Sequence, residues 1–316
     1  MKYQIYKFHF STAVHIGNGN LSDGESTVCA DTLFSALCHE AVKYGGQKCI
    51  DSLVKYAKNG NLIFSDMLPF IADNLYIPKP LCPVNAEQNG DSIQKKKFKK
   101  LKFIPVGKLD AYLDGILDLE DETKKIKALG KFEMRTMSSS LDVEKSRDGD
   151  MLPYSVGVYT FSKNSGLYVL AGFENTDAQK LFELLVYNLS YSGIGGKLSA
   201  GLGKYSVEKA DVPNEIQQKL ERKADKYVTV STAMAAADEM EKTLENANYL
   251  LVKRTGFVSS TAYSKGTKSD FLRKKDFYSF KSGSCFVNKF VGDVFDVSNG
   301  GAHAVYRYAK PLFIGV

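Results

Sequence analysis

Glycine, lysine and serine residues gather in one stretch near the middle of the chain, Gly193-Ile-Gly-Gly-Lys-Leu-Ser-Ala-Gly-Leu-Gly-Lys204. Glycine at this density marks backbone that needs a positive φ or that another molecule approaches closely. Lys197, Ser199 and Lys204 add two cations and a hydroxyl to the same stretch. Because backbone amides and cationic side chains together bind phosphate, the stretch is a candidate phosphate clamp.

The glycine pattern does not fit the common nucleotide-binding fingerprints. Leu198 stands where a Walker loop needs its first glycine, and Leu198 and Ser206 stand where G-x-G-x-x-G needs its third. The order of elements is also reversed, because a helix over about 177–189 precedes the loop and a strand over 204–208 follows it. A glycine-rich helix end with a tight turn is the alternative to a phosphate clamp.

The histidines and cysteines indicate no metal site and no cofactor. None of the four histidines forms an H-x-x-x-H pair, and none of the five cysteines forms a C-x-x-C pair. The cysteines therefore predict neither a disulfide framework nor a zinc knuckle, and they suit a reducing cytoplasm. His15 follows the first predicted strand, where a histidine can act as a general acid or base or can simply hold a turn.

Bulk composition is that of an ordinary globular protein. The chain has 316 residues, enough for about two domains, and 44% of them are hydrophobic and 25% charged. The net charge of +6 permits an anionic partner without requiring one. No apolar run approaches the roughly 20 residues that span a bilayer, so we expect no membrane contact and a cytoplasmic location.

Hydrophobic periodicity predicts mixed helices and strands in the first half. Residues 2–10 alternate like a strand, and Asp31 is placed to cap a helix that ends at Gly45-Gly46. Asp177 is placed to cap the helix before the glycine loop, and residues 156–161 and 167–170 read as the two strands of a hairpin.

From Pro78 to about residue 155 the pattern changes, which predicts an insertion that projects from the first sheet. Six lysines lie between Lys95 and Lys102, as either a solvated arm or an arm along nucleic acid. The second half again alternates strands with a helix, over about 235–247. We therefore predict an α+β protein with a first domain over 1–212, its insertion over about 78–155, and a second domain over 213–316.

Four segments resemble the RAMP superfamily of CRISPR proteins, and within it the type III-A (Csm) subunit that caps the 5′ handle of crRNA. They are Ala30-Asp-Thr-Leu-Phe-Ser-Ala-Leu37, the loop Gly193 to Lys204, Lys253-Arg-Thr-Gly-Phe257 and His303-Ala-Val-Tyr-Arg-Tyr-Ala-Lys-Pro-Leu-Phe313. The last segment departs from the expected pattern at Ala304, where proline is usual, and at Ala309, where glycine is usual. The resemblance implies two ferredoxin-like (RRM-related) domains, with the insertion of the first acting as a thumb between guide and target RNA.

The implied function is that of a non-catalytic RNA-binding subunit without cofactors. Its partners would be crRNA, target RNA near the handle, the large polymerase-like subunit and the backbone RAMP subunits. Single-stranded RNA is held by phosphate contacts and by stacking of its bases. The candidate RNA contacts are His15, Gly17, Asn18, Arg135, Arg147, Gly195, Gly196, Lys197, Ser199, Gly201, Gly203, Lys204, Lys253, Arg254, His303, Tyr306 and Arg307.

Other interpretations of these residues stay open. Tyr306 and Phe257 could be ordinary core residues, and Lys253-Arg254 a strand end that faces solvent. A metal-independent endoribonuclease that cuts CRISPR repeat RNA would use His15 as its acid or base. A pure assembly protein would instead turn its basic residues toward an acidic partner.

Overall fold

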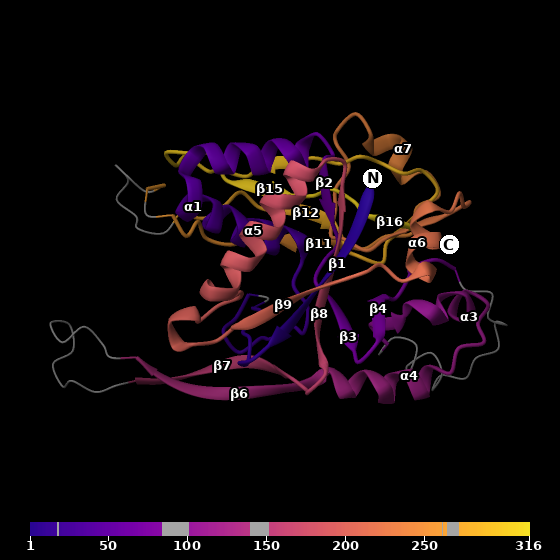
Figure 1. Ribbon diagram of the computed structural model, residues 1–316, viewed down its shortest axis with the longest axis horizontal. Coiled ribbons are helices and arrows are strands. Elements are labelled where there is room, and N and C mark those ends of the chain that lie inside the picture. Colours follow the sequence, from indigo (N-terminus) through magenta and orange to yellow (C-terminus); the bar gives the residue numbers. More distant parts are fainter. Residues whose placement is uncertain (18, 84–100, 140–151, 261, 264–271) are drawn as a thin grey trace, which may run out of the picture.

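The computed structural model describes residues 1–17, 19–83, 101–139, 152–260, 262–263 and 272–316. Asn18, Arg147 and most of the lysine run lie outside the described residues. An antiparallel sheet organises the first half of the chain (Figure 1). Its strands are β1 (Lys2–Phe10), β2 (Leu62–Phe64), β3 (Leu68–Ile71), β4 (Asn74–Pro78), β5 (Phe103–Pro105), β8 (Ser165–Phe173) and β9 (Tyr205–Ala210). The spatial order is β5-β4-β3-β8-β1-β9, and β2 also pairs with β8.

Two helices cover one face of this sheet, α1 (Ala30–Lys58) and α5 (Thr176–Ser192) (Figure 1). Along the chain these elements follow as β1, α1, β2 and β3, β8, α5 and β9. In the sheet, four of the strands lie side by side in the order β3-β8-β1-β9. This is the ferredoxin-like arrangement, so the predicted α+β class is confirmed. Gly45 and Gly46 have non-helical dihedrals, as predicted, but the helix resumes beyond them instead of ending.

Alternation along the strands separates two cores. Tyr6 and Phe8 of β1 pack with the helices, and Ile5 faces the opposite side of the sheet with Tyr168 and Leu170 of β8. Every residue of β8 is buried, because helices cover one of its faces and the C-terminal half covers the other. The sheet is therefore the middle layer of the molecule.

The segment between β3 and β8 leaves the sheet and returns to it. After β4 and β5 come η1 (Val106–Lys108), α3 (Leu109–Leu113), α4 (Leu119–Lys125), η2 (Ile126–Leu129), β6 (Gly130–Ser139) and β7 (Leu152–Phe161). β6 and β7 form a long two-stranded ribbon that projects from the body (Figure 1). The predicted hairpin of 156–161 with 167–170 is wrong, because β7 pairs along its length with β6, whereas β8 enters the central sheet.

The second half forms smaller sheets around β10 (Tyr227–Thr229). Its neighbours are β13 (Cys285–Phe286) and β16 (Phe313–Gly315), which repeats the third-first-fourth order of a ferredoxin-like sheet. The helix expected over 235–247 is confined to α7 (Met240–Leu244). The remaining elements are α6 (Asn214–Glu221), β11 (Leu251–Arg254), β12 (Phe277–Phe280), β14 (Val294–Asp296) and β15 (Tyr306–Tyr308). The domain boundaries stay a prediction.

A disulfide joins the base of the insertion to the second half. Cys82, shortly after β4, bonds to Cys285 of β13 across 203 residues of sequence, with their Cα atoms 5.6 Å apart. Beside it, the Leu81 amide donates a 2.8 Å hydrogen bond to the Gly283 carbonyl. Cysteine spacing did not predict this bond, because the tertiary structure alone brings the two residues together.

Candidate nucleic-acid interface

The glycine loop leaves α5 and packs against the chain that follows β1. The Gly196 amide donates to the His15 carbonyl at 2.8 Å, and the Gly203 amide donates to the Ala13 carbonyl at 2.8 Å. The amides of Gly193 and Gly201 also donate within the chain, to Leu189 and Leu198 carbonyls. Four of the five glycine amides of the candidate phosphate clamp therefore already have acceptors inside the protein.

These glycines are needed for close packing inside the loop. Gly203 has a φ of +75°, and a Cβ there would overlap the Ile194 carbonyl oxygen. Gly195 has a φ of +99°, and a Cβ there would lie 2.5 Å from the His15 carbonyl oxygen. Side chains at these positions would push the loop away from its neighbours, so the glycines first of all build the loop.

The loop tip, residues 197–201, remains open to solvent. Leu198, Ser199, Ala200 and Gly201 are exposed. Within the described part of the chain, the amides of Lys197, Leu198 and Ser199 meet no hydrogen-bond acceptor. Amides that point to solvent beside lysine are groups that bind phosphate, so the clamp hypothesis now applies to the tip.

Both lysines of the loop are anchored at their amines. Lys197 Nζ lies 4.5 Å from the ring centre of Tyr154 on β7 and 3.2 Å from its hydroxyl. Lys204 Nζ donates to the carbonyl oxygen of Tyr191 in the last turn of α5. Each amine keeps donors to spare, since an ammonium group carries three. The loop therefore holds two oriented cations at its ends.

A groove of about 1020 Å³ runs from the loop, past the start of α1, to the second half of the chain. Of the predicted residues it gathers His15, Gly17, Gly195, Gly196 and Arg254. Its basic side chains also include Lys102 and three lysines that the sequence pattern did not single out, Lys43, Lys79 and Lys281. Its carboxylates are Glu25, Glu40 and Asp66. Lys102 belongs to the predicted basic run, whereas the other three come together only through the fold.

His15 occupies the wall of this groove in a largely structural setting. Its side chain is 6% exposed, and Nδ1 lies 2.7 Å from the Gly157 carbonyl oxygen. A Cβ at Gly196 would come 2.6 Å from the His15 ring, so loop and ring pack tightly. His39 lines the same groove, and burial together with Lys274 and Lys43 lowers the pKa of His39.

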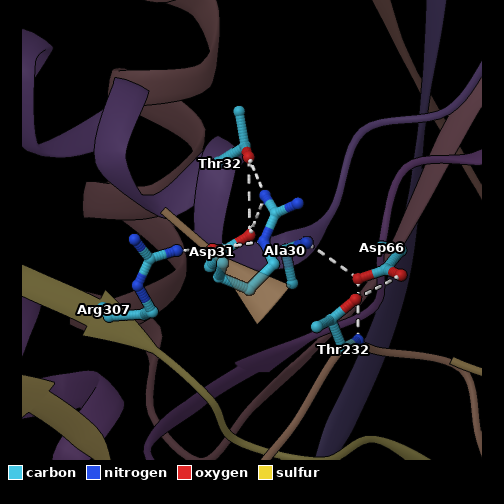
Figure 2. Close-up of polar contacts among 7 residues, drawn as sticks. Ala30, Asp31, Thr32, Asp66, Thr232 and Arg307 are labelled. Carbon is cyan, nitrogen blue, oxygen red and sulfur yellow. Dashed lines mark hydrogen bonds and ion pairs between the residues drawn. The ribbon is translucent and has the colours of Figure 1, made fainter. Parts of the chain in front are cut away.

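Arg254 and Arg307 converge on one carboxylate at the start of α1 (Figure 2). Arg254 Nε and Nη2 donate to Asp31 at 3.0 and 2.9 Å, and Nη2 also donates to the Thr32 hydroxyl at 2.8 Å. Arg307, 5% exposed, donates from Nη1 to Asp31. Burial alone would raise the pKa of Asp31, but the two guanidinium groups outweigh it and hold that pKa below its usual value.

This cluster corrects the expected cap. The residue that precedes α1 is Cys29, which makes no side-chain cap, and Asp31 binds the arginines instead. Because the guanidinium group of Arg307 faces the interior, we leave Arg307 out of the proposed RNA surface. Lys253, the sequence neighbour of Arg254, is exposed and pairs with Asp276 at 2.7 Å.

A second buried carboxylate, Asp66, lies close by (Figure 2). It accepts hydrogen bonds from the Ala30 amide at 2.7 Å, the Thr232 amide at 2.8 Å and the Thr232 hydroxyl at 3.0 Å. Burial raises the pKa of Asp66 despite these bonds. Both carboxylates thus tie the start of α1 to the second half and fix the floor of the groove.

The remaining predicted contacts lie apart from the groove. Arg135 projects from β6 and meets Glu133 and Thr160, each at 3.4 Å. The His303 ring meets the Ser260 hydroxyl at 2.9 Å, and Tyr306 packs on the edge of the helix-side core. In the described ranges no group of three or more acidic, cysteine or histidine side chains could hold a metal ion. No helix among these residues is long and apolar enough to cross a membrane.

Known protein families match both halves of the chain. The RAMP superfamily matches residues 7–206, and the CRISPR Csm4 C-terminal domain matches residues 222–316. The "CRISPR system Cms protein Csm4" of Mycobacterium tuberculosis (strain ATCC 25618 / H37Rv) is 34% identical over 316 residues, which are 100% of this chain and 98% of that protein. The protein of the same name from Streptococcus thermophilus is 33% identical and spans 99% of this chain and 98% of its own.

Solved structures share the fold. A chain of the Csm3-Csm4 subcomplex in the type III-A CRISPR-Cas interference complex superposes with a TM-score of 0.67 at 19% identity, covering 100% of this chain and 99% of its own. A chain of the Csm1-Csm4 cassette in complex with pppApA gives a TM-score of 0.59 at 17% identity, covering 100% and 98%. The resemblance seen in the sequence is thereby confirmed, and the chain belongs to the Csm4 family of CRISPR proteins, within the RAMP superfamily.

Proposed function

We propose that this chain is the non-catalytic subunit of a type III-A CRISPR effector complex that holds the 5′ handle of crRNA. The observation that carries the proposal is a basic groove that begins at an open glycine-loop tip, in a chain of the Csm4 family. Structures of relatives pair Csm4 with Csm1 and with Csm3, so we propose the large subunit and a backbone RAMP subunit as protein partners. Such a complex would work in the cytoplasm.

The RNA backbone would follow the groove from the loop tip. At the tip, the amides of residues 197–199 and the Ser199 hydroxyl can donate to one phosphate. Lys43 and Lys281 line the groove, and Lys204, outside the groove lining, holds its amine at the Tyr191 carbonyl at the end of α5. Each lysine that neutralises a phosphate releases counterions, so binding of this kind depends steeply on salt.

The β6–β7 ribbon suits the thumb that the resemblance implies. It projects beyond the sheet (Figure 1). Phe132 and Met134 on one face of β6 are about half exposed, and strand alternation places Arg135 on the other face. Exposed apolar side chains can pack on bases, and a cation can hold a phosphate. We therefore propose that the ribbon contacts target RNA near the handle.

Salt-dependent binding of a labelled handle RNA to the full chain tests the groove. We expect Lys204→Ala and Lys281→Ala each to weaken binding by roughly tenfold or less and to reduce the slope of log K against log salt by about one unit. Lys289→Ala is the matched control, because Lys289 lies over the Tyr227 ring, 4.0 Å from its centre, and belongs neither to the groove lining nor to the glycine loop. Unchanged affinity and slope in both lysine variants, Lys204→Ala and Lys281→Ala, would favour the pure assembly protein.

The metal-independent endoribonuclease is the alternative. His15 and His39 line one groove, which two-histidine acid–base chemistry would require. Against it, His15 is almost fully buried, and its Nδ1 is held by Gly157. Cleavage of repeat RNA in the presence of a chelator, lost in His15→Ala, would overturn the non-catalytic assignment.

A further inference from the structure

The most exposed large apolar side chain among the described residues is Tyr191, at 82%. It lies in the last turn of α5, two residues before the glycine loop, and its neighbour Ser192 lines the groove. An isolated surface aromatic needs no explanation by itself. Tyr191 differs from an isolated aromatic because hydrogen bonds hold the backbone around it and two lysines bond to its own and the next residue.

The backbone beneath Tyr191 is held on two sides. Lys204 Nζ donates to the Tyr191 carbonyl oxygen, and the Gly193 amide donates to the Leu189 carbonyl. The ring therefore extends from a fixed helix end and not from a loose segment. An aromatic ring on a fixed base loses little conformational entropy when a ligand packs on it.

Two cations bond to the chain that carries this ring. Lys204 donates to the Tyr191 carbonyl, and Lys43 donates to the hydroxyl of Ser192, the next residue, at 2.9 Å. Glu40 is already paired with Lys43 at 2.7 Å. An exposed aromatic ring with two cations bonded to its own and the next residue suits a nucleobase and its phosphates.

We propose that Tyr191 is a stacking platform for one unpaired base of the RNA that enters the groove at the loop tip. The proposal rests on the proposed function, since it needs RNA in the groove. Single-stranded RNA is the occupant because Ser192, the next residue, lines the basic groove, and lysines bond to the Tyr191 carbonyl and to the Ser192 hydroxyl. Stacking accepts any base, so Tyr191 would contribute affinity more than sequence specificity.

The experiment pairs a protein variant with an abasic scan. Full-chain protein is titrated with a labelled 5′-handle RNA and with versions that lack one base at each position in turn. We expect Tyr191→Ala to raise Kd by roughly five- to a hundredfold and Tyr191→Phe to leave it unchanged. One abasic position should weaken wild-type binding as much, and that position should cost nothing further in Tyr191→Ala.

Controls separate this proposal from the proposed function. Ile116→Ala removes a comparably exposed apolar side chain, 77% exposed, that lies outside the groove, and should leave Kd unchanged. Suppose that wild-type protein binds the RNA, but that Tyr191→Ala leaves Kd unchanged or that its effect on Kd adds to the effect of every abasic position. The stacking platform is then refuted, while the proposed function stands. If Tyr191→Ala instead weakens only capture of a Csm1 or Csm3 subunit, the surface docks protein and the platform is again refuted. Absence of RNA binding by the wild type would overturn both proposals.

Discussion

Replacing each of the two buried carboxylates by its amide should have very different effects on stability. Asp31→Asn and Asp66→Asn keep the shape of the side chain and remove its charge. Asp31 faces the guanidinium groups of Arg254 and Arg307, whereas Asp66 faces two backbone amides and the Thr232 hydroxyl. The first substitution breaks a buried ion cluster, and the second weakens hydrogen bonds from uncharged donors.

The expected magnitudes follow from these partners. Removing one partner of a buried ion pair typically costs about 3–5 kcal/mol, because it leaves an uncompensated charge, here on Arg307. The NH₂ group that Asp31→Asn introduces would also point at a guanidinium donor. At Asp66 the amide oxygen can still accept from the backbone, so we expect a loss of about 1 kcal/mol, the usual net value of a hydrogen bond.

The pH dependences should have opposite signs. The folded-state pKa of Asp31 is lowered, so its contribution is fully present above the unfolded pKa near 3.9 and is lost as pH falls through the folded pKa. The folded-state pKa of Asp66 is raised, so the folded state binds the proton more tightly than the unfolded state does. As the pH falls toward 4, the free energy of unfolding of the wild type should therefore rise relative to that of Asp66→Asn. Below pH 4, the difference in free energy of unfolding between the wild type and Asp31→Asn should shrink.

Urea unfolding of the full chain at pH 7 and at lower pH measures both differences as shifts of the midpoint. Asp276→Asn is the control, since its surface pair with Lys253 is exposed and should leave the midpoint unchanged. Equal destabilisation by Asp31→Asn and Asp66→Asn at pH 7, or a larger effect at Asp66, would refute the claim that the arginine cluster holds the two halves together.

Two further predictions concern the loop and the disulfide. Gly203→Ala should destabilise the fold by several kcal/mol more than Gly201→Ala in urea unfolding, because a Cβ at Gly203 overlaps the Ile194 carbonyl. A Cβ at Gly201 meets no atom within 4 Å, so that substitution costs only the strain of the left-handed backbone, about 1–2 kcal/mol. Equal unfolding midpoints of the two variants would contradict the loop packing. Reducing the bond between Cys82 and Cys285 should lower the free energy of unfolding by on the order of 2–4 kcal/mol. Thiol titration of the unfolded, unreduced protein should find three thiols, and finding five would refute the bond.

Local patterns predicted the elements of the first sheet well. The helical spacing of Ala178, Phe182, Leu185 and Leu189 gave the buried face of α5, and the alternation over residues 2–10 gave β1. Helix caps were predicted less well. Asn175, two residues before the predicted Asp177, accepts from the Ala178 amide at 2.8 Å. Several polar residues near a helix start can serve as its cap, and sequence alone does not choose among them.

Contacts between distant residues could not be predicted in this way. Asp31 meets arginines that are 223 and 276 residues further along the chain, so the arginines looked like free cations. Lys43 and Lys281 enter one groove only because α1 and the second half pack together. The pairing of β7 with β6 could not be predicted either. The turn between residues 161 and 165 is compatible with β7 pairing either with β8 or with β6. Composition located the loop and its two lysines, and only the fold located Lys43 and Lys281 in the groove.

The glycine loop shows how one motif can serve packing and binding at once. Gly195, Gly196 and Gly203 allow the loop to lie against the chain after β1, where the amides of the last two are consumed. That packing fixes the ends of the loop, and the 3-10 turn η3 (Leu198–Ala200) orders its tip. The amides of residues 197–199, which meet no acceptor among the described residues, are therefore held in place. A donor group held in place before the ligand arrives binds with less loss of entropy than one in a loose loop. Bare amides throughout the loop would have been the weaker site, because nothing would have oriented them.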